Sequence, residues 1–368
     1  MKKYSEAFVG FDTAKKRHAV AVADVGRDGE IRYFGEIDSS PAAIEKLLGK
    51  LAERYATLRV CYEAGPTGYG LYRQVRALGH DCTVVAPSLI PRRPGERVKT
   101  NRRDAVTLAR LFRAGELTSL WVPDAVHEAV RDLVRAREAA AQDFRKKRQQ
   151  LLSFLLRHGR MFGGRKHWSL AHWRWLAGQK FEHAAQQIVF QDAVDAIEDA
   201  AARLLDEQLL AIVPSWSMAP VVAAYQAMRG VSFIVAVTFV AEIGDVRRFG
   251  NPRQLMAFLG LVPAERSTGE RVRRAGLTLA GNRRARRVLV EGAWSYRYPA
   301  RVGETLRTRL DGLPKAVRDI AWKAQIRLCA RYRRLSAAGK KTPVVIAAIA
   351  REMAAFLWAI GRHVAPAT

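Results

Sequence analysis

The sequence predicts an α/β domain at the N-terminus, a long helical arm in the middle and a mostly helical C-terminal domain. Strand-like and helix-like segments alternate over the first hundred residues, and apolar residues recur at heptad spacing after Val126. The segment after Pro214 is mixed but mostly helical. We expect domains at 1–123, 124–214 and 215–368, which suits a chain of 368 residues at roughly 100–200 residues per domain.

The N-terminal domain is expected to hold five strands and three helices. Short apolar runs predict the strands, and apolar residues at helical spacing predict the helices. The expected strands are 7–11, 18–22, 31–34, 58–62 and 82–86, and the expected helices are 42–51, 71–78 and 105–111. Three strands, a helix and a strand in this order are typical of ribonuclease-H-like nucleases, whose sheet carries helices on its faces.

Two heptad-spaced apolar runs predict an antiparallel helical arm, packed as a coiled coil. The first run is Val130, Leu133, Ala140, Phe144, Leu151 and Phe154, and the second is Phe190, Val194, Ile197, Ala201 and Leu204. Charged residues interrupt the first run, which favours a sister subunit or a phosphate backbone as partner over a plain solvated arm. The tryptophans between the runs are expected to pack in a connecting helix rather than stack on unpaired bases.

The charge of the chain indicates a polyanionic partner. Lys and Arg number 62 against 35 Asp and Glu, which gives a net charge of +27 and points to nucleic acid. The apolar run 231–241 is far shorter than the roughly 20 residues that span a bilayer. The opening MKKYSEAFVGFD reaches an aspartate before a signal-peptide core could form, so a cytoplasmic location is expected. The three cysteines lack CxxC spacing and are expected to be buried packing residues.

The arginine-rich tract from Arg266 to Arg287 is predicted to bind nucleic acid. Glycines, Ser and Thr are interleaved with the charges, and arginine suits bidentate contact with phosphate. A solvated charged face is the alternative interpretation. The expected nucleic-acid-binding residues are Arg266, Arg271, Arg273, Arg274, Arg283, Arg284, Arg286 and Arg287.

Acidic residues stand where strands end or a helix begins. Asp12 closes the first strand, Glu63 closes the fourth, and Asp104 lies at the start of a helix, one turn after Asn101. Carboxylates at a sheet edge can hold the Mg²⁺ or Mn²⁺ ions that phosphoryl transfer on DNA requires. The alternative makes Asp104 a helix-cap or first-turn residue and Asp12 the start of a turn.

Six segments in order resemble one protein family, and they run nearly from end to end of the chain. They are GFDTAKKRH, YEAGPTGYG, VKTNRRDAVTLARL, AEIGDVRRFGNPRQLMAFLGLVP, ERSTGERVRRAGLTLAGNRRARRVL and AWKAQIRLCARYRRL. The chain resembles the bacterial transposases of the insertion-sequence-110 family, whose N-terminal domain is similar to Holliday-junction resolvases. The resemblance implies a DNA recombinase.

The resemblance also implies roles for particular residues and partners. The acidic tetrad of the family falls on Asp12, Glu63, Asn101 and Asp104, and Asn101 departs from the usual aspartate. A serine of the family's C-terminal domain falls on Ser267, where attack on a DNA phosphate would give a phosphoserine. A structured non-coding guide RNA is implied as well, and a catalytic site split between two domains suggests a homodimer or homotetramer with the helical arm as the contact. Two rival functions stay open: a hydrolytic Holliday-junction-type nuclease, and a non-enzymatic basic DNA-binding protein.

Overall fold

The computed structural model describes residues 4–91, 100–269 and 271–367, and the chain divides into two compact units. The first unit covers residues 1–122 and the second covers 123–368. The elements of the first unit are β1 (Tyr4–Thr13), β2 (Arg17–Asp24), β3 (Ile31–Asp38), α1 (Pro41–Arg54), β4 (Tyr55–Glu63), α2 (Gly70–Ala77), β5 (Asp81–Val85), the 3-10 turn η1 (Pro87–Leu89) and α3 (Asn101–Arg113).

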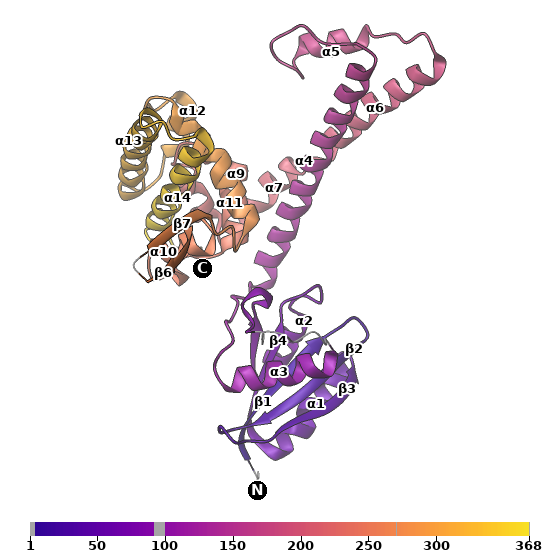
Figure 1. Cartoon of the computed structure of the whole chain (residues 1–368), viewed down its shortest axis with the longest axis vertical. Coiled ribbons are helices and arrows are strands. Elements are labelled where there is room, and N and C mark those ends of the chain that lie inside the picture. Colours follow the sequence, from indigo (N-terminus) through magenta and orange to yellow (C-terminus); the bar gives the residue numbers. More distant parts are fainter. Residues whose placement is uncertain (1–3, 92–99, 270, 368) are drawn as a thin grey trace. The chain divides into compact units, whose positions relative to one another are not determined.

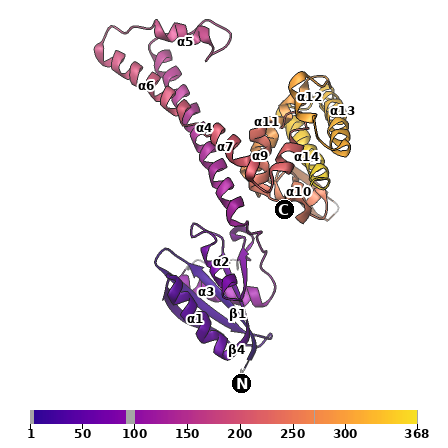
Figure 2. The ribbon, with the colours of Figure 1, turned by 180° about the vertical axis from the view of Figure 1, so that it is seen from behind.

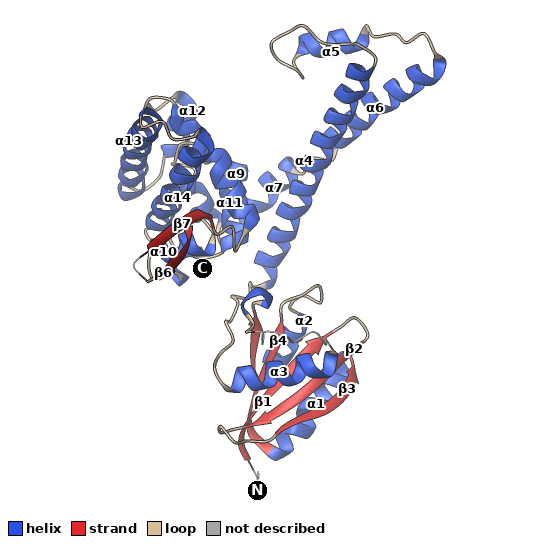
Figure 3. Ribbon diagram, in the orientation of Figure 1, coloured by secondary structure: helices blue, strands red, loops and turns tan. Residues whose placement is uncertain are grey.

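The second unit is mostly helical, with one β-hairpin (Figure 3). Its first elements are α4 (Ala125–Arg157), α5 (Leu170–Ala177), α6 (Ala184–Ala202), α7 (Asp206–Ile212), η2 (Val213–Ser215), α8 (Ala219–Tyr225), α9 (Phe233–Ile243) and η3 (Val246–Arg248). They are followed by α10 (Pro252–Phe258), β6 (Pro263–Thr268), β7 (Arg271–Leu277), α11 (Arg283–Ala293), η4 (Trp294–Arg297), α12 (Glu304–Leu310), α13 (Lys315–Ala337) and α14 (Thr342–Gly361).

The sheet of the first unit has the strand order β3-β2-β1-β4-β5 (Figure 1). β2 pairs antiparallel with β1 and β3, whereas β4 pairs parallel with β1 and β5. Parallel strands need a crossover, and α1 and α2 supply the two crossovers of this sheet. Each strand and helix that the sequence predicted here overlaps an observed element, so the expected mixed α/β domain is confirmed.

Helices cover both faces of this sheet (Figure 2). Val9 and Phe11 of β1 pack with Leu48 of α1 on one face. On the other face, the small residues Ala19, Ala21 and Ala23 of β2 pack with Ala105 and Ala109 of α3. Because side chains alternate along a strand, residues 8, 10 and 12 of β1 belong to the α3 face.

The arm consists of α4 and α6, with α5 at its far end. The Arg137 guanidinium bonds to Asp206 just beyond α6, while Phe154 contacts Phe181 just before it, so the two helices run antiparallel. Phe154 and Phe190 belong to one buried cluster between the helices. The N-terminal part of the predicted seam differs: Val130 packs into the core of the C-terminal helices instead of against α6. Coiled-coil packing along the whole arm therefore stays a prediction.

The C-terminal helices share one large core, in which α9 is nearly sealed from solvent. Of the described helices, α14 alone is long and apolar enough by composition to cross a membrane, and 50% of its apolar window is buried. Leu357 and Ile360 of this helix belong to the core. The uninterrupted apolar run of residues 231–241 lies largely in α9, whereas α14 is longer and its apolar sequence is interrupted by Arg351 and Glu352. Cys61, Cys82 and Cys329 are free and buried, as predicted.

Candidate active site

Two carboxylates lie at the ends of neighbouring strands and on one face of the sheet. In the parallel pairing of β1 with β4, Gly10 lies beside Cys61. Both of these residues face α3: a Cβ on Gly10 would meet the Ala105 carbonyl, and the Cys61 thiol contacts the Leu108 carbonyl. Asp12 and Glu63 each follow by two residues, so they share that face, and both are partly buried.

The first turn of α3 brings the other two tetrad positions to the same face. The helix begins at Asn101, and the Thr100 hydroxyl caps it by accepting from the Arg103 backbone N–H at 3.3 Å. Asp104 is therefore a first-turn residue and not the cap. Asn101 is exposed, whereas Asp104 is partly buried. A Cβ on Gly10 would stand 2.6 Å from the Ala109 backbone nitrogen, so glycine permits α3 to approach β1 this closely.

The donor chemistry of this edge suits a hard divalent cation, because carboxylate and amide oxygens are the ligands that Mg²⁺ and Mn²⁺ prefer. Within residues 4–91, 100–269 and 271–367, no three His, Cys, Asp or Glu side chains gather closely enough to hold a metal ion. The backbone thus places Asp12, Glu63 and Asp104 on one face without drawing their side chains into a cluster. We call these three residues and Asn101 the acidic edge.

Ser267 lies on the exposed β6–β7 hairpin. Its hydroxyl donates a hydrogen bond of 2.7 Å to Oε1 of Glu265, two residues earlier on the same strand. Both side chains are exposed. In the antiparallel register, Ser267 lies opposite Val272, and Arg266 lies opposite Arg273. The hairpin therefore presents a serine, a carboxylate and arginines on one small exposed element.

The arginine tract separates into two groups. Arg266, Arg271, Arg273 and Arg283 are exposed, and they suit contact with phosphate. The side chain of Arg274 lies outside the described part of the structure, although its backbone pairs with Glu265 in the hairpin.

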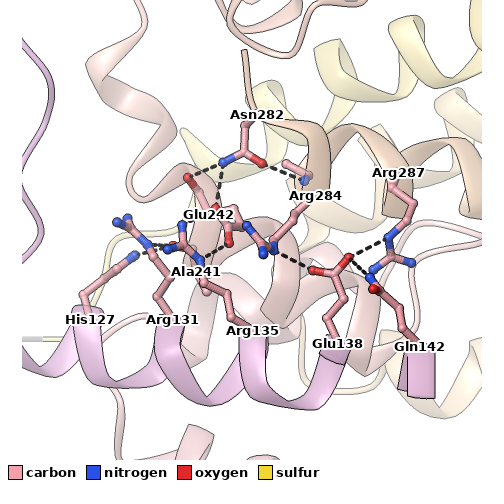
Figure 4. Close-up of polar contacts among 11 residues, drawn as sticks. His127, Arg131, Arg135, Glu138, Gln142, Ala241, Glu242, Asn282, Arg284 and Arg287 are labelled. Carbon is pink, nitrogen blue, oxygen red and sulfur yellow. Dashed lines mark hydrogen bonds and ion pairs between the residues drawn. The ribbon is translucent and has the colours of Figure 1, made fainter. Parts of the chain in front are cut away.

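The other arginines of the tract bond to the protein itself. Arg284 and Arg287 of α11 both donate to Glu138 of the arm helix α4, at 2.6 and 3.2 Å (Figure 4). Arg286 donates to the backbone carbonyl of Leu259 at 2.7 Å. Glu138 is buried between α4 and α11, so removing both arginines would leave a buried charge without its partners.

A second buried carboxylate, Glu242 at the end of α9, belongs to the same polar network (Figure 4). Arg135 of α4 donates two hydrogen bonds to it, and the Asn282 amide donates a third at 2.7 Å. Burial by itself would raise the pKa of Glu242, but the hydrogen bonds from Arg135 and Asn282 lower that pKa below its ordinary value. The ionised carboxylate therefore joins α4, α9 and the Asn282 cap of α11.

The tip of the arm is an aromatic cluster. Trp168, Trp173 and Trp175 are partly buried against the apolar core of the arm, so packing, as expected, occupies these rings. His172 is fully buried beside Trp175, and desolvation lowers its pKa.

Sequence reasoning missed Glu265, Glu138 and Glu242. Glu265 could have been found from its position two residues before Ser267, since residues i and i+2 of a strand share a face. Glu242 carries a weaker signal, a single charge inside an apolar run. Nothing in the sequence pairs Glu138 with arginines that follow almost 150 residues later.

The sheet has the strand order β3-β2-β1-β4-β5, and acidic residues lie near the ends of β1 and β4. This arrangement is consistent with the class of ribonuclease-H-like domains found in DEDD transposases. A transposase family model named for the DEDD transposases of IS110 matches residues 9–159. A second model, described as transposase IS116/IS110/IS902 family, matches residues 223–305.

Individual relatives agree with these matches. The chain is 56% identical over 360 residues to "Putative transposase y4qE" of Sinorhizobium fredii, covering 98% of this chain and 90% of that protein. It is 30% identical over 342 residues to the transposase for insertion sequence element IS1533 of Leptospira borgpetersenii, covering 91% of this chain and 98% of that protein. The chain belongs to the IS110 family of insertion-sequence transposases.

Proposed function

We propose that this transposase cuts and rejoins DNA by Mg²⁺- or Mn²⁺-dependent phosphoryl transfer with Ser267 as the nucleophile. The observation that carries the proposal is the exposed Ser267 hydroxyl, which lies on a hairpin between exposed arginines. Serine becomes a good nucleophile when a neighbouring group takes its proton, and Ser267 already donates to a carboxylate. Its primary hydroxyl is also less hindered than the β-branched hydroxyl of Thr268.

The acidic edge supplies the metal-binding part of this proposal. Asp12, Glu63 and Asp104 would hold the ion together with the side-chain oxygen of Asn101. A bound divalent cation would polarise the DNA phosphate and offset the charge that develops on its oxygens. Because the Asn101 amide is neutral where the family has an aspartate, the site would carry one negative charge fewer. We expect weaker metal binding as a result.

The exposed arginines of the hairpin would bind the DNA backbone. Arg266, Arg271 and Arg273 lie on the face of the hairpin opposite to Ser267, and each can donate to phosphate oxygens of the DNA backbone. Arg283, the first residue of α11, would extend this surface, and Arg274 belongs to the same proposal from its position in β7. Arg284, Arg286 and Arg287 contribute through the fold instead, because each bonds to other parts of the chain.

Several partners complete the proposal. A structured non-coding RNA would pair with the target DNA and with the ends of the element. In a homodimer or homotetramer, the serine of one subunit would act at the acidic edge of another, with the helical arm as the contact.

The three domains, 1–123, 124–214 and 215–368, would then serve as acidic domain, arm and serine domain. The reaction would take place in the cytoplasm.

A hydrolytic nuclease that uses only the acidic edge is the second candidate function. Asp12 and Glu63 lie on one face of the sheet, and both belong to the first unit, so their arrangement does not depend on the C-terminal helices. This observation favours a nuclease that does not use Ser267. In that reaction water replaces Ser267, and DNA is cut without being rejoined.

The test is to incubate protein, guide RNA, Mg²⁺ and DNA carrying the element ends and a target. Recombined product that depends on both RNA and Mg²⁺ supports the proposal. Cut DNA without joined product indicates the hydrolytic nuclease, and binding without any cutting indicates a non-enzymatic DNA-binding protein. A parallel reaction with Asp12→Asn controls for contaminating nucleases.

A further inference from the structure

We propose that Glu265 is a further catalytic residue, which takes the proton of the Ser267 hydroxyl when the serine attacks DNA and returns it when the strands are rejoined. This inference rests on the proposed function of Ser267. It assigns a role to a carboxylate outside the acidic edge.

The geometry of the hairpin directs the serine proton to this carboxylate. Ser267 and Glu265 are separated by one residue in β6, so their side chains lie on the same face of the strand. The Ser267 Oγ lies 2.7 Å from Glu265 Oε1, which is a length typical of a hydroxyl bonded to a charged acceptor. An ionised carboxylate has no proton to donate, so the hydroxyl hydrogen lies between the two oxygens.

The same geometry selects Ser267 over the neighbouring hydroxyl. Side chains of consecutive residues in a strand point to opposite faces, so Thr268 points away from Glu265. A strand that contains adjacent Ser and Thr therefore gives only the serine a proton acceptor at i−2. This pairing supports Ser267 as nucleophile independently of the family motif.

The hairpin carries more arginines than glutamates, which reduces the electrostatic repulsion between Glu265 and DNA phosphates. A glutamate next to a phosphate is repelled by it, but β6 and β7 with their turn hold four arginines against two glutamates. Exposed Arg266 and Arg273 pair across the two strands on the face opposite to Glu265 and Ser267, whereas the backbone of Arg274 lies opposite Glu265. The net positive charge of the hairpin attracts DNA in spite of Glu265, while the carboxylate keeps its hydrogen bond from Ser267.

The bonds and protons of the step balance. Ser267 Oγ forms a bond to phosphorus while its proton passes to Glu265, and the bond from phosphorus to the sugar oxygen of the leaving strand breaks. That oxygen takes a proton from water and leaves as a hydroxyl. In rejoining, a DNA hydroxyl gives its proton to water and attacks phosphorus, and Ser267 Oγ leaves with the proton that Glu265 held. No oxidant, reductant or further reactant is needed.

The experiment measures the single-turnover rate of covalent protein–DNA adduct formation on end-labelled DNA with the full-length protein, RNA and Mg²⁺. Glu265→Gln should slow the adduct by on the order of 10²–10⁴-fold, which is typical for loss of a general base, while DNA binding is retained. Glu265→Asp should slow it less. Added formate, a small carboxylate, should restore part of the rate in Glu265→Ala. Glu304→Gln, which removes an exposed carboxylate of α12, serves as the matched control at wild-type rate.

Two results would overturn the inference: Glu265→Gln forming the adduct at the wild-type rate, or a slow Glu265→Ala that does not respond to formate. A merely structural role would not give formate rescue. Ser267→Ala separates this failure from failure of the proposed function. If Ser267→Ala still forms the adduct, the nucleophile itself has been assigned wrongly; if it forms none while Glu265→Gln is unimpaired, only the role of Glu265 is wrong.

Discussion

Arg135 on the arm helix holds the buried carboxylate of Glu242 with two hydrogen bonds, Nε to Oε1 at 2.8 Å and Nη2 to Oε2 at 3.1 Å. The Glu242 side chain is only 2% exposed. Asn282 donates to the same carboxylate and also accepts from the Ala285 backbone N–H as the cap of α11. The ionised Glu242 carboxylate therefore holds α4 against α9 and helps to fix the N-terminus of α11.

Glu242→Gln should lower the free energy of unfolding by about 1–3 kcal/mol at pH 7, because Arg135 and Asn282 then lose the ionised acceptor and a buried amide N–H group faces them instead. The pKa of Glu242 is lowered in the folded protein, so its contribution is present above its unfolded pKa, near 4.3, and is lost as the pH falls through the folded value. The difference in the free energy of unfolding between wild type and Glu242→Gln should be constant between pH 6 and 8 and should shrink below about pH 4. Urea unfolding across this range measures it, and a difference unchanged at pH 3 would contradict the ionised assignment.

Gly10→Ala should displace α3 and impair cleavage. The new Cβ would stand 2.6 Å from the Ala109 nitrogen and 2.7 Å from the Ala105 oxygen, and both are backbone atoms that cannot rotate away. Asp104, one residue before Ala105, would move with the helix. The expected loss of stability is about 1–3 kcal/mol, the typical cost of overpacking, as measured by urea unfolding.

Gly49→Ala is the matched control for this substitution. Gly49 lies inside α1, and a Cβ there meets nothing within 4 Å. Alanine in a helix is favoured over glycine by roughly 1 kcal/mol, so this variant should be slightly more stable and fully active. Equal stability and equal cleavage activity of Gly10→Ala and Gly49→Ala would show that the position of α3 does not depend on its close approach to Gly10.

Replacing Arg266, Arg271 and Arg273 together by glutamine should weaken binding to DNA of any sequence. For every arginine–phosphate interaction that is removed, the slope of log K against log salt should fall by roughly 0.9 for duplex DNA. Fluorescence anisotropy over a range of salt concentrations measures that slope. The double variant Arg284→Gln and Arg287→Gln is the control: it should lower stability through Glu138 and leave the slope nearly unchanged. A slope that falls in the double variant and not in the triple variant would place the phosphate contacts on Arg284 and Arg287 instead.

Asp12→Asn and Asp104→Asn should each abolish DNA cleavage while folding and DNA binding are retained. Each change removes a negative charge that a divalent cation needs and preserves the side-chain shape. Cleavage assays across a Mg²⁺ titration, with circular dichroism as the folding control, check this result. Cleavage that survives in both variants would exclude the acidic edge as a metal site.

Asn101→Asp tests the same site in the opposite direction. Restoring the charge that the family pattern contains should preserve cleavage or raise it at low Mg²⁺, since a carboxylate binds a hard cation better than an amide does. Loss of cleavage in Asn101→Asp would mean that the amide has a role other than as a ligand.

The first unit was predictable because its signals are local. The apolar runs in β1, β2, β4 and β5 and the helical spacing in α1 follow directly from residue order. The relation between Asp12 and Glu63 could also be anticipated, because the ends of parallel strands meet at one edge of a sheet.

The second unit was less predictable because its decisive contacts join distant segments. Val130 matches a heptad seam but packs with the C-terminal helices, since a repeat of apolar residues does not specify its partner. Arg284 and Arg287 are indistinguishable in sequence from their neighbours, and only their bonds to Glu138 distinguish them from Arg266, Arg271, Arg273 and Arg283.

The covalent adduct itself tests the serine mechanism most directly. Labelled DNA incubated with the protein, RNA and Mg²⁺ should give a protein–DNA species on a denaturing gel, and Ser267→Ala should abolish that species while DNA binding is retained. We expect this result because the phosphoserine bond needs the Ser267 hydroxyl. If Ser267→Ala cuts at the wild-type rate and releases free 5′-phosphate ends, then water is the nucleophile, and the hydrolytic nuclease replaces the serine recombinase.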